Sequence, residues 1–382
     1  MVLLVPGQPR RSAAREGHVR SPSALPPCLV SPTPIRELRL RIGFEIELLA
    51  PPGSSRADLA AEVARRSGGD VHRFFHTDSE PSLVPGMDHF IHLTPGFDVV
   101  DERGRPMCRL VDDITIREDL DPRMPPHPGW YRIVGDEPRL MRLVHRLADP
   151  AAPLETVLDR VGETFGVAPR EVGGVVRVDD VSGATIAMAA PAPGERERPC
   201  EVITPPIDAD HADHLEQLLR PARDLGFTVP AEAAVHLHVD AAPLREVSTF
   251  ANLVRLFSTW REPLRSALAT NPRCRRLAPL PPGVVDLVAD GSSGRLPRSW
   301  ADLCALVSPL GMTKYADINL TRLIRPRSDR DTVEIRCLPG AIDTTDVIAR
   351  ASLVEALLDR CRDPRPLPVP SPTSRVEDLL DA

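Results

Sequence analysis

Three short segments, far apart in the chain, alternate ionisable and apolar residues in the manner of a half-buried β-strand. They are Gly43-Phe44-Glu45-Ile46-Glu47, Val235-His236-Leu237-His238-Val239 and Thr332-Val333-Glu334-Ile335-Arg336. Residues two apart on a strand point to the same face, so each segment turns a pair of ionisable side chains to one side. Burying such groups without partners would cost on the order of several kcal/mol each. The pattern therefore predicts a partner on that side, and a divalent metal with phosphate is the simplest one.

Composition narrows the class of protein. The chain has 382 residues, of which 42% are hydrophobic and 26% are charged, as is usual for a soluble globular protein. Its net charge of −7 and its aromatic content of 4% disfavour a nucleic-acid surface, which needs a basic stripe and stacking rings. We therefore expect no nucleic-acid partner.

The sequence also favours a cytoplasmic location. No stretch approaches the roughly 18 apolar residues that a membrane span needs, so we expect no membrane partner. The apolar run at the start is too short for a signal peptide. The seven cysteines are scattered without a C-x-x-C, which indicates reduced thiols and not a disulfide framework.

The chain divides into three parts by composition. Residues 1–34 are rich in Pro, Ser and Arg and are predicted to be a disordered leader. Residues 363–382 are a Pro-rich tail. Residues 35–362 show no linker and are predicted to form a single domain, in which 70–135 is an elaboration with only short strands such as 90–93.

The order of the predicted elements favours an α+β fold with a mostly antiparallel sheet, because strands and helices do not alternate regularly. Apolar spacing predicts helices over 140–147, 154–165, 215–225 and 345–361, and a long one over 243–269 that breaks near Pro263. Strands are predicted over 38–49, 175–179, 184–189, 200–204, 234–240, 318–323 and 332–337.

Each charged pair also has an ordinary explanation. Glu45 and Glu47 share their strand with Arg39 and Arg41, so an exposed ladder of arginines and glutamates is one alternative. Carboxylate oxygens that point together are otherwise what Mg²⁺ binds.

Other candidates stay open in the same way. The pair His236 and His238 could belong to a zinc site, and Glu334 with Arg336 could be a surface ion pair. Asp112-Asp113 and the loop at 194–198 are expected at the surface. The pairs His72/His76 and His89/His92 fall in an irregular region and receive no role.

One lysine stands among the 47 basic residues, and it is Lys314. Arginine bias explains the others. A single retained lysine indicates either a position where a compact ammonium is needed and a guanidinium does not serve, or chance.

Taken in order, six segments resemble the amidoligase family, a branch of the carboxylate–amine ligases related to glutamine synthetase and glutamate–cysteine ligase. The resemblance runs from about Arg39 to Leu358. It rests on GFEIE (43–47), CEVITPP (200–206), HLHVD (236–240), NPRCRRL (271–277), KYADINL (314–320) and TVEIRCLPGAID (332–343).

This resemblance implies a glutamine synthetase catalytic-domain-like fold, in which a curved antiparallel sheet forms a funnel with helices packed outside. It implies ATP and two or three Mg²⁺ ions, which Mn²⁺ could replace. The metal ligands that it implies are Glu45, Glu47, Glu201, His236 and Glu334.

Four further residues receive roles from the resemblance. His238 and Lys314 would face the ATP phosphates, and Arg336 would face the carboxylate substrate or its phosphoryl form. Lys314 would thus serve both catalysis and cofactor binding. Asn319 lies in the same motif and is grouped with the cofactor-binding residues.

The implied reaction joins a small-molecule carboxylate to an amine, either free or on a peptide or protein side chain, through an acyl phosphate. Such chemistry needs positioning and charge neutralisation more than covalent help from the protein. Three alternatives remain: a kinase of a carboxylate or guanidino group on the same scaffold, a zinc hydrolase that uses His236 and His238, and an inactive binding module.

Overall fold

The computed structural model describes residues 37–81, 89–289, 296–326 and 331–381. The predicted disordered leader, residues 1–34, lies outside these described residues. Residues Ile35–Ala382 form one compact unit, and the sheet below belongs to it.

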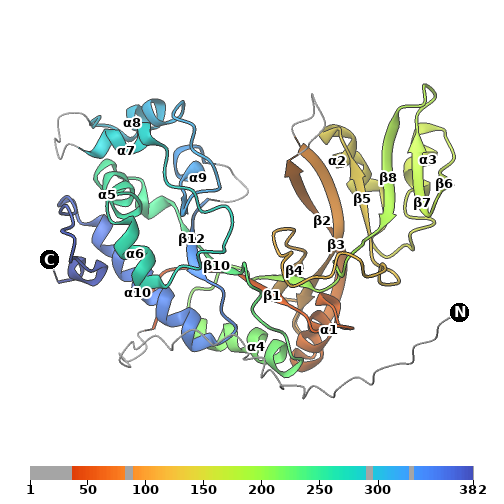
Figure 1. Ribbon diagram of the computed structural model, residues 1–382, viewed down its shortest axis with the longest axis horizontal. Helices are drawn as coiled ribbons and strands as arrows, with labels where there is room; N and C mark the ends of the chain where they lie inside the picture. The colour runs from red at the N-terminus through yellow and green to blue at the C-terminus, as the bar shows by residue number, and fades with distance from the viewer. Residues whose placement is uncertain (1–36, 82–88, 290–295, 327–330, 382) are drawn as a thin grey trace, which may run out of the picture. The chain divides into compact units, whose positions relative to one another are not determined.

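Twelve strands of the described residues form one sheet (Figure 1). Every pair of neighbouring strands is antiparallel. The order is β11-β12-β10-β1-β9-β4-β3-β5-β8-β7-β6, and β2 pairs with β3 outside this path. The strands are β1 (Ile42–Leu49), β2 (Asp70–Pro81), β3 (His89–Val100), β4 (Pro106–Val111), β5 (Tyr131–Gly135), β6 (Arg170–Val172), β7 (Val175–Asp179), β8 (Thr185–Pro191), β9 (Pro199–Ile203), β10 (Ala234–Asp240), β11 (Ile318–Asn319) and β12 (Thr332–Pro339).

Most of the helices follow β9 in the sequence. They are α1 (Arg56–Ser67), α2 (Pro138–Leu147), α3 (Asp159–Phe165), α4 (His211–Asp224), α5 (Val247–Phe257), α6 (Arg261–Leu268), α7 (Pro282–Ala289), α8 (Trp300–Val307), α9 (Thr321–Ile324) and α10 (Thr344–Arg362). The predicted α+β class with an antiparallel sheet is confirmed. The closer likeness to the glutamine synthetase catalytic domain stays a prediction.

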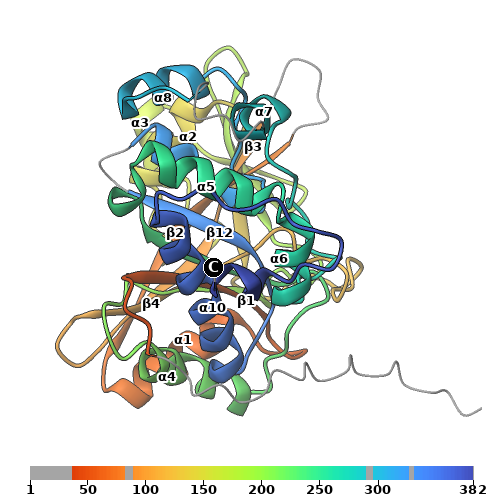
Figure 2. The same cartoon turned by 90° about the vertical axis from the view of Figure 1, so that its left-hand side faces the viewer.

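Strand β1 lies between β10 and β9 in the sheet, and its apolar residues meet helices on one face. Phe44, Ile46 and Leu48 are fully buried and belong to a large core cluster that includes side chains of α1, α4, α5 and α10. Figure 2 shows α5 and α10 in front of β1 and β12. Since side chains alternate along a strand, Glu45 and Glu47 must point to the opposite face.

A second, smaller core cluster lies at the other end of the sheet. Leu93 of β3, Ile133 of β5 and Ala187 of β8 pack there with Met141 and Val144 of α2. The strands β5, β7 and β8 thus have their own helical cover. The opposite face of β3 and β5 carries the alternate side chains, which do not belong to this cluster.

The structure corrects the interpretation of residues 70–135. The sequence indicated an irregular elaboration with short strands, yet β2 and β3 run antiparallel over twelve residues each and are part of the main sheet. His72 and His76 therefore lie on a regular strand. Polar residues at alternate positions of β2 concealed it, because they face a polar site and not a core.

One smaller prediction was also wrong. The strand expected over 318–323 ends at Asn319, because a short helix, α9, begins at Thr321. The predicted break of the long helix near Pro263 is confirmed, and it lies at residues 258–260, between α5 and α6. Pro263 itself stands in the first turn of α6, where a proline disrupts no helical hydrogen bond.

The Pro-rich tail packs against the helices through Asn252 of α5. The Asn252 amide nitrogen donates to the carbonyl oxygens of Asp363 and Arg365 at 2.9 and 3.0 Å, and its oxygen accepts from the Leu367 amide at 3.0 Å. Trp260 donates from its indole nitrogen to the Pro368 carbonyl at 2.7 Å. These bonds hold an extended segment that makes few bonds of its own.

Among the helices of the described residues, none combines the length and the apolar character that crossing a bilayer requires.

We expect Asn252→Ala to lower the free energy of unfolding by about 3 kcal/mol, because it leaves several buried carbonyl and amide groups without partners. Urea denaturation measures this change. Gln217→Ala on the exposed side of α4 is the matched control and should differ from the wild type by less than about 0.5 kcal/mol. Equal stability of Asn252→Ala and wild type would show that the tail does not depend on this side chain.

Candidate functional site

The strand registers bring the ionisable pairs of β1, β10 and β12, together with Glu201 of β9, to one face of the sheet. Glu45 stands opposite His236, and Glu47 stands opposite Glu201. On the other side of β10, His238 stands opposite Glu334, which is in turn opposite Asn319 of β11. Cross-strand partners point to the same face, so these segments, more than 150 residues apart at the extremes, share one site.

Glu45 lies at the centre of this site and contacts both histidines. Its Oε2 lies 3.1 Å from His236 Nδ1, and its Oε1 lies 3.0 Å from His238 Nε2. Burial alone would raise the pKa of the Glu45 carboxyl, but His238 and His236 outweigh burial and hold the pKa well below its usual value. Glu45 is therefore an ionised carboxylate between two imidazoles.

Glu334 and Arg336 form a second fixed pair. Arg336 donates from Nη1 to Glu334 Oε1, and Asn319 donates to Glu334 Oε2 at 2.9 Å. The Asn319 amide is oriented because its oxygen accepts from the backbone amide of Thr321 at 3.1 Å. Although burial opposes ionisation, Arg336 and His236 lower the pKa of Glu334. The pair is buried and does not match the surface ion pair that the sequence left open.

Glu47 and Glu201 are crowded carboxyl groups. Burial, followed by the charge of Asp113, raises the pKa of Glu47 well above its usual value, although Glu47 accepts a hydrogen bond from the Ala234 amide at 2.8 Å. Burial, followed by the charges of Glu45 and Asp113, raises the pKa of Glu201 in the same way. Both groups would gain from a nearby cation.

Two sets of side chains in the described residues offer metal-ligand atoms within 4.8 Å of one another. One set is Glu45, Glu201 and His236, and the other is Glu45, His238 and Glu334. Carboxylate oxygens are the preferred ligands of Mg²⁺ and Mn²⁺, and Mn²⁺ also accepts imidazole. The chemistry of these donors fits the divalent ions that the resemblance implies.

The sets differ from the predicted ligands in two respects. Glu47 belongs to neither set, although its Oε1 lies 3.5 Å from His236 Nε2. His238, which was assigned to the ATP phosphates, is instead in the second set. Among the described residues, neither set contains both histidines.

Two cavities meet at these side chains. The larger, of about 620 Å³, is lined by Glu45, Glu201, His238 and Glu334, with Lys314 and Asn319 at its side. The smaller, of about 110 Å³, is lined by Glu45, Glu47, Glu201 and His236. Arg336 lines both. Of the predicted site residues, Glu45, Glu201 and Arg336 line both cavities and the others line one of the two. Lys314 is the exposed one among the predicted residues.

Several site residues were missed from sequence. His72 and His76 of β2 line the larger cavity together with Arg109 and Arg322, and Asp78 and Asp113 line the smaller one. The alternation of His72, His76 and Asp78 at even spacing was the available signal. This signal is weak because the intervening residues, 73–75 and 77, do not have the apolar pattern of a buried strand.

Two expectations of surface exposure were wrong. Asp112 is only 4% exposed and is paired with Arg196, which also donates to the carbonyl oxygen of Ile116 at 2.7 Å. Glu197 and Arg198 are buried as well, and Arg198 donates to the Ala50 carbonyl at 2.9 Å. The charged loop is thus part of the interior framework and not a solvated turn.

The exposed ladder considered for Glu45 and Glu47 is absent from the described residues. Arg39 pairs with Glu355 and Asp359, and Arg41 lies near Asp208 at 3.3 Å. The arginines of the first strand segment are thus used elsewhere, and the two glutamates face the site without them.

Comparison with known proteins is consistent with the motifs. A sequence model of a family described as putative amidoligase enzyme matches residues 38–358. This range contains every strand of the sheet and all the predicted site residues, and it confirms the resemblance that the six motifs indicated. No curated protein and no solved structure matches the chain in the same comparisons.

We expect Mg²⁺ or Mn²⁺ to raise the free energy of unfolding, by roughly 1–3 kcal/mol at saturating concentration, because the ion binds the folded site and relieves its carboxylate crowding. Urea denaturation with the ion or with EDTA measures this. Glu201→Gln should lose most of the gain, whereas the exposed control Glu163→Gln should retain it. Equal gains in Glu201→Gln and wild type would remove Glu201 from the ion site.

The raised pKa of Glu201 gives a pH-dependent prediction for the metal-free protein. A carboxyl whose pKa is higher in the folded state lowers stability above its unfolded value of 4.5 and has no such effect well below it. Without metal, Glu201→Gln should therefore be more stable than wild type at pH 7.5, by about 1 kcal/mol, and lose this advantage near pH 4. A constant difference across this range would contradict the crowding.

Proposed function

Because the chain belongs to the amidoligase family, we propose that it is an ATP- and Mg²⁺-dependent ligase that joins a carboxylate to an amine. The observation that carries the proposal is the convergence of Glu45, Glu201, His236, His238 and Glu334 from four strands on one face of the sheet. Family membership supports a ligase-type enzyme, and this convergence supports the use of divalent ions.

The larger cavity suits the nucleotide. Its volume of about 620 Å³ lies within the usual range for small-molecule sites, and its lining combines the carboxylates with Arg109, Arg322 and Lys314. Basic side chains together with a carboxylate cluster suit a triphosphate. The basic side chains and divalent ions held by the carboxylates would both neutralise its charge. Lys314 is exposed and would approach the phosphates from the side of the cavity.

Arg336 is placed to hold the reacting carboxylate. It lines both cavities, and Glu334 fixes one of its guanidinium nitrogens. Arginine binds carboxylates and phosphates in the same planar geometry, so one side chain could hold the substrate before and after phosphorylation.

The proposed reaction has two steps. A carboxylate oxygen of the substrate attacks the γ-phosphorus of ATP, and the bond to the bridging oxygen breaks to release ADP. The amine nitrogen then attacks the carbonyl carbon of the acyl phosphate, phosphate leaves with the bonding electrons, and the nitrogen loses a proton. The chain's part in both steps is to align the reactants and to neutralise charge.

Divalent ions, when bound, would supply charge neutralisation along the phosphates. Glu45, Glu201 and His236 would hold one, and Glu45, His238 and Glu334 would hold another. Glu47 belongs to neither set, and its Oε1 lies 3.5 Å from His236 Nε2, so it would orient that imidazole.

The direct test is ADP release in the presence of Mg²⁺, screened against pools of amino acids, other carboxylates and polyamines, with mass analysis of the product. An amide that forms only with both substrates supports the ligase. Release of ADP with a phosphorylated product and no amine dependence would point to the kinase alternative. No ADP release with any pool would contradict the proposal.

We expect Glu334→Gln to reduce ADP release by at least about a hundredfold, because it removes a ligand charge and the partner of Arg336 at once. Glu45→Gln should act similarly. Circular dichroism and urea denaturation show whether each variant folds, and Glu163→Gln controls for the loss of one surface charge. Activity within a few-fold of wild type in both site variants would exclude these residues from the ion site.

Lys314→Arg keeps the positive charge but replaces a compact ammonium with a larger planar group. We expect a loss of about tenfold or more in kcat/KM for ATP, since a point contact with phosphate does not tolerate the change. Steady-state kinetics measures it. Wild-type values would mean that the single lysine has no special role.

A further inference from the structure

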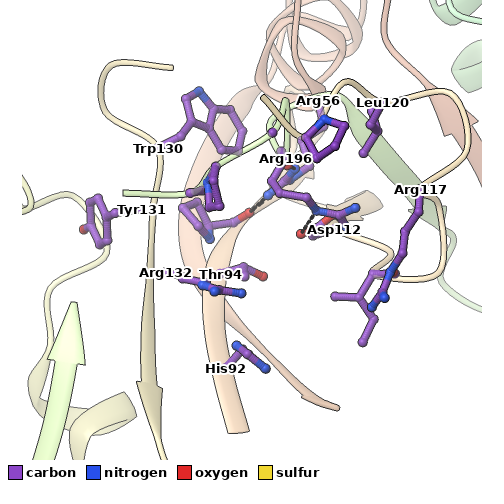
Figure 3. A pocket seen from close by; sticks show the side chains of 16 residues that line it. Arg56, His92, Thr94, Asp112, Arg117, Leu120, Trp130, Tyr131, Arg132 and Arg196 are labelled. Atoms are coloured by element: carbon purple, nitrogen blue, oxygen red, sulfur yellow. Dashed lines mark hydrogen bonds and ion pairs between the residues drawn. The ribbon is translucent and has the colours of Figure 1, made fainter. Parts of the chain in front are cut away.

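A third cavity, of about 510 Å³, is lined by residues of β3 and β5 and of the segments 112–122 and 192–196 (Figure 3). We call it the distal cavity. Its floor comes from β3 and β5, where His92 pairs with Val134 and Leu93 with Ile133. Because Leu93 and Ile133 point into the smaller core, the alternate residues Thr94 and Arg132 face the other way, into the cavity.

The face is continuous with that of the site. Arg109 of β4 pairs with Ile203 of β9 and with Asp98 of β3, so Asp98 and Thr94, both on β3, share the side that carries Glu45 and Glu201. Asp112 lines both the distal cavity and the 110 Å³ cavity that contains the carboxylates. The Asp112 side chain therefore adjoins both a ligand in the distal cavity and the cavity of the carboxylates.

Most of the arginines in the distal cavity are already engaged. Arg56 donates to the Pro95 carbonyl at 3.1 and 3.0 Å and stacks on Trp130 at 4.4 Å. Arg196 is held by Asp112 and by the Ile116 carbonyl. These contacts hold both side chains in place and so define the shape of the cavity.

Arg132 differs from them. Its guanidinium is half-buried at the floor of the cavity and, within the part of the chain that the structure describes, has no hydrogen bond or ion pair. Figure 3 shows it beside Thr94. A guanidinium at such a position is a ready binding group for an anion.

Thr94 provides a second, independent indication of a ligand. The residue is 6% exposed, and its hydroxyl has no hydrogen-bond partner among the described residues. A buried hydroxyl without a partner costs free energy. Its position beside Arg132 means that one ligand group could satisfy both.

The rest of the lining contains His92 and Arg117 and an apolar part. Ile114, Leu120 and Trp130 form the apolar part, and Trp130 is held between Arg56 at 4.4 Å and the ring of Phe97, whose centroid lies 5.8 Å away. Apolar lining with a few converging polar groups is typical of small-molecule sites. One available guanidinium, with the Asp112 carboxylate nearby, suits a single negative charge better than a phosphate dianion.

We propose that the distal cavity binds a carboxylate carried on an apolar body, with the carboxylate on Arg132 and Thr94 and the body against Trp130. If the ligase function is correct, this group is the part of a substrate that lies away from the reacting centre, and one substrate is then an amino-acid-like or peptide-like molecule with a second carboxylate. The binding itself does not require ATP, Mg²⁺ or catalysis.

Calorimetric titration with hippurate (N-benzoylglycine), a carboxylate joined to a phenyl ring through an amide, tests the proposal in the full chain without ATP or Mg²⁺. Its neutral amide, hippuramide, is the matched ligand. Wild type should bind hippurate at least tenfold more tightly than hippuramide. Arg132→Gln should weaken hippurate binding by roughly tenfold to a hundredfold. The affinities for hippurate and hippuramide should then be similar. Arg142→Gln, on the exposed side of α2, loses the same charge and should match wild type.

The variant Thr94→Val shows whether the Thr94 hydroxyl binds ligand or stabilises the fold. We expect roughly threefold to tenfold weaker hippurate binding, with a free energy of unfolding equal to or above that of wild type. Lower stability of Thr94→Val, equal binding of the two ligands by wild type, or unchanged binding in Arg132→Gln would each overturn the proposal. These outcomes are independent of ADP release, so loss of the ligase proposal and loss of the distal site can be told apart.

Discussion

The contact on which this structure depends most is the carboxylate of Glu45 between the imidazoles of His236 and His238. It exists because β1 and β10 pair in one antiparallel register, and a slip by one residue would turn every ionisable group of β1 into the core. Burial of Phe44 and Ile46 against the helices fixes that register from the other face. The hydrophobic core and the polar site are therefore two consequences of the same strand pairing.

Short-range alternation was sufficient to predict the central part of this arrangement. The strands that carry Glu45, His236 and Glu334, and the helices α4 and α10, lie where apolar periodicity placed them. Their mutual arrangement required the family resemblance, because no local pattern specifies which strands become neighbours. The site roles of these residues stay predictions, but the structure brings their side chains together as the motifs required.

The parts that could not be predicted share one physical cause. β2 and the loop at 194–198 bury polar and charged side chains against other polar groups, and sequence patterns are read on the assumption that burial is apolar. His76 and Arg198 are examples, since one faces the site and the other binds a buried carbonyl. The same cause hid Arg132 and Thr94, whose environment depends on strands and loops that are distant in sequence.

Glu45 contributes an oxygen to both sets of potential ion ligands. Two ions that share a carboxylate cannot be bound independently, because each withdraws charge from the group that holds the other. Their affinities would then be thermodynamically linked, with equal coupling in both directions. Occupancy of the two positions would depart from simple hyperbolic saturation as the free cation concentration rises. The affinity for a nucleotide that already carries an ion would likewise depend on whether the other ion position is occupied.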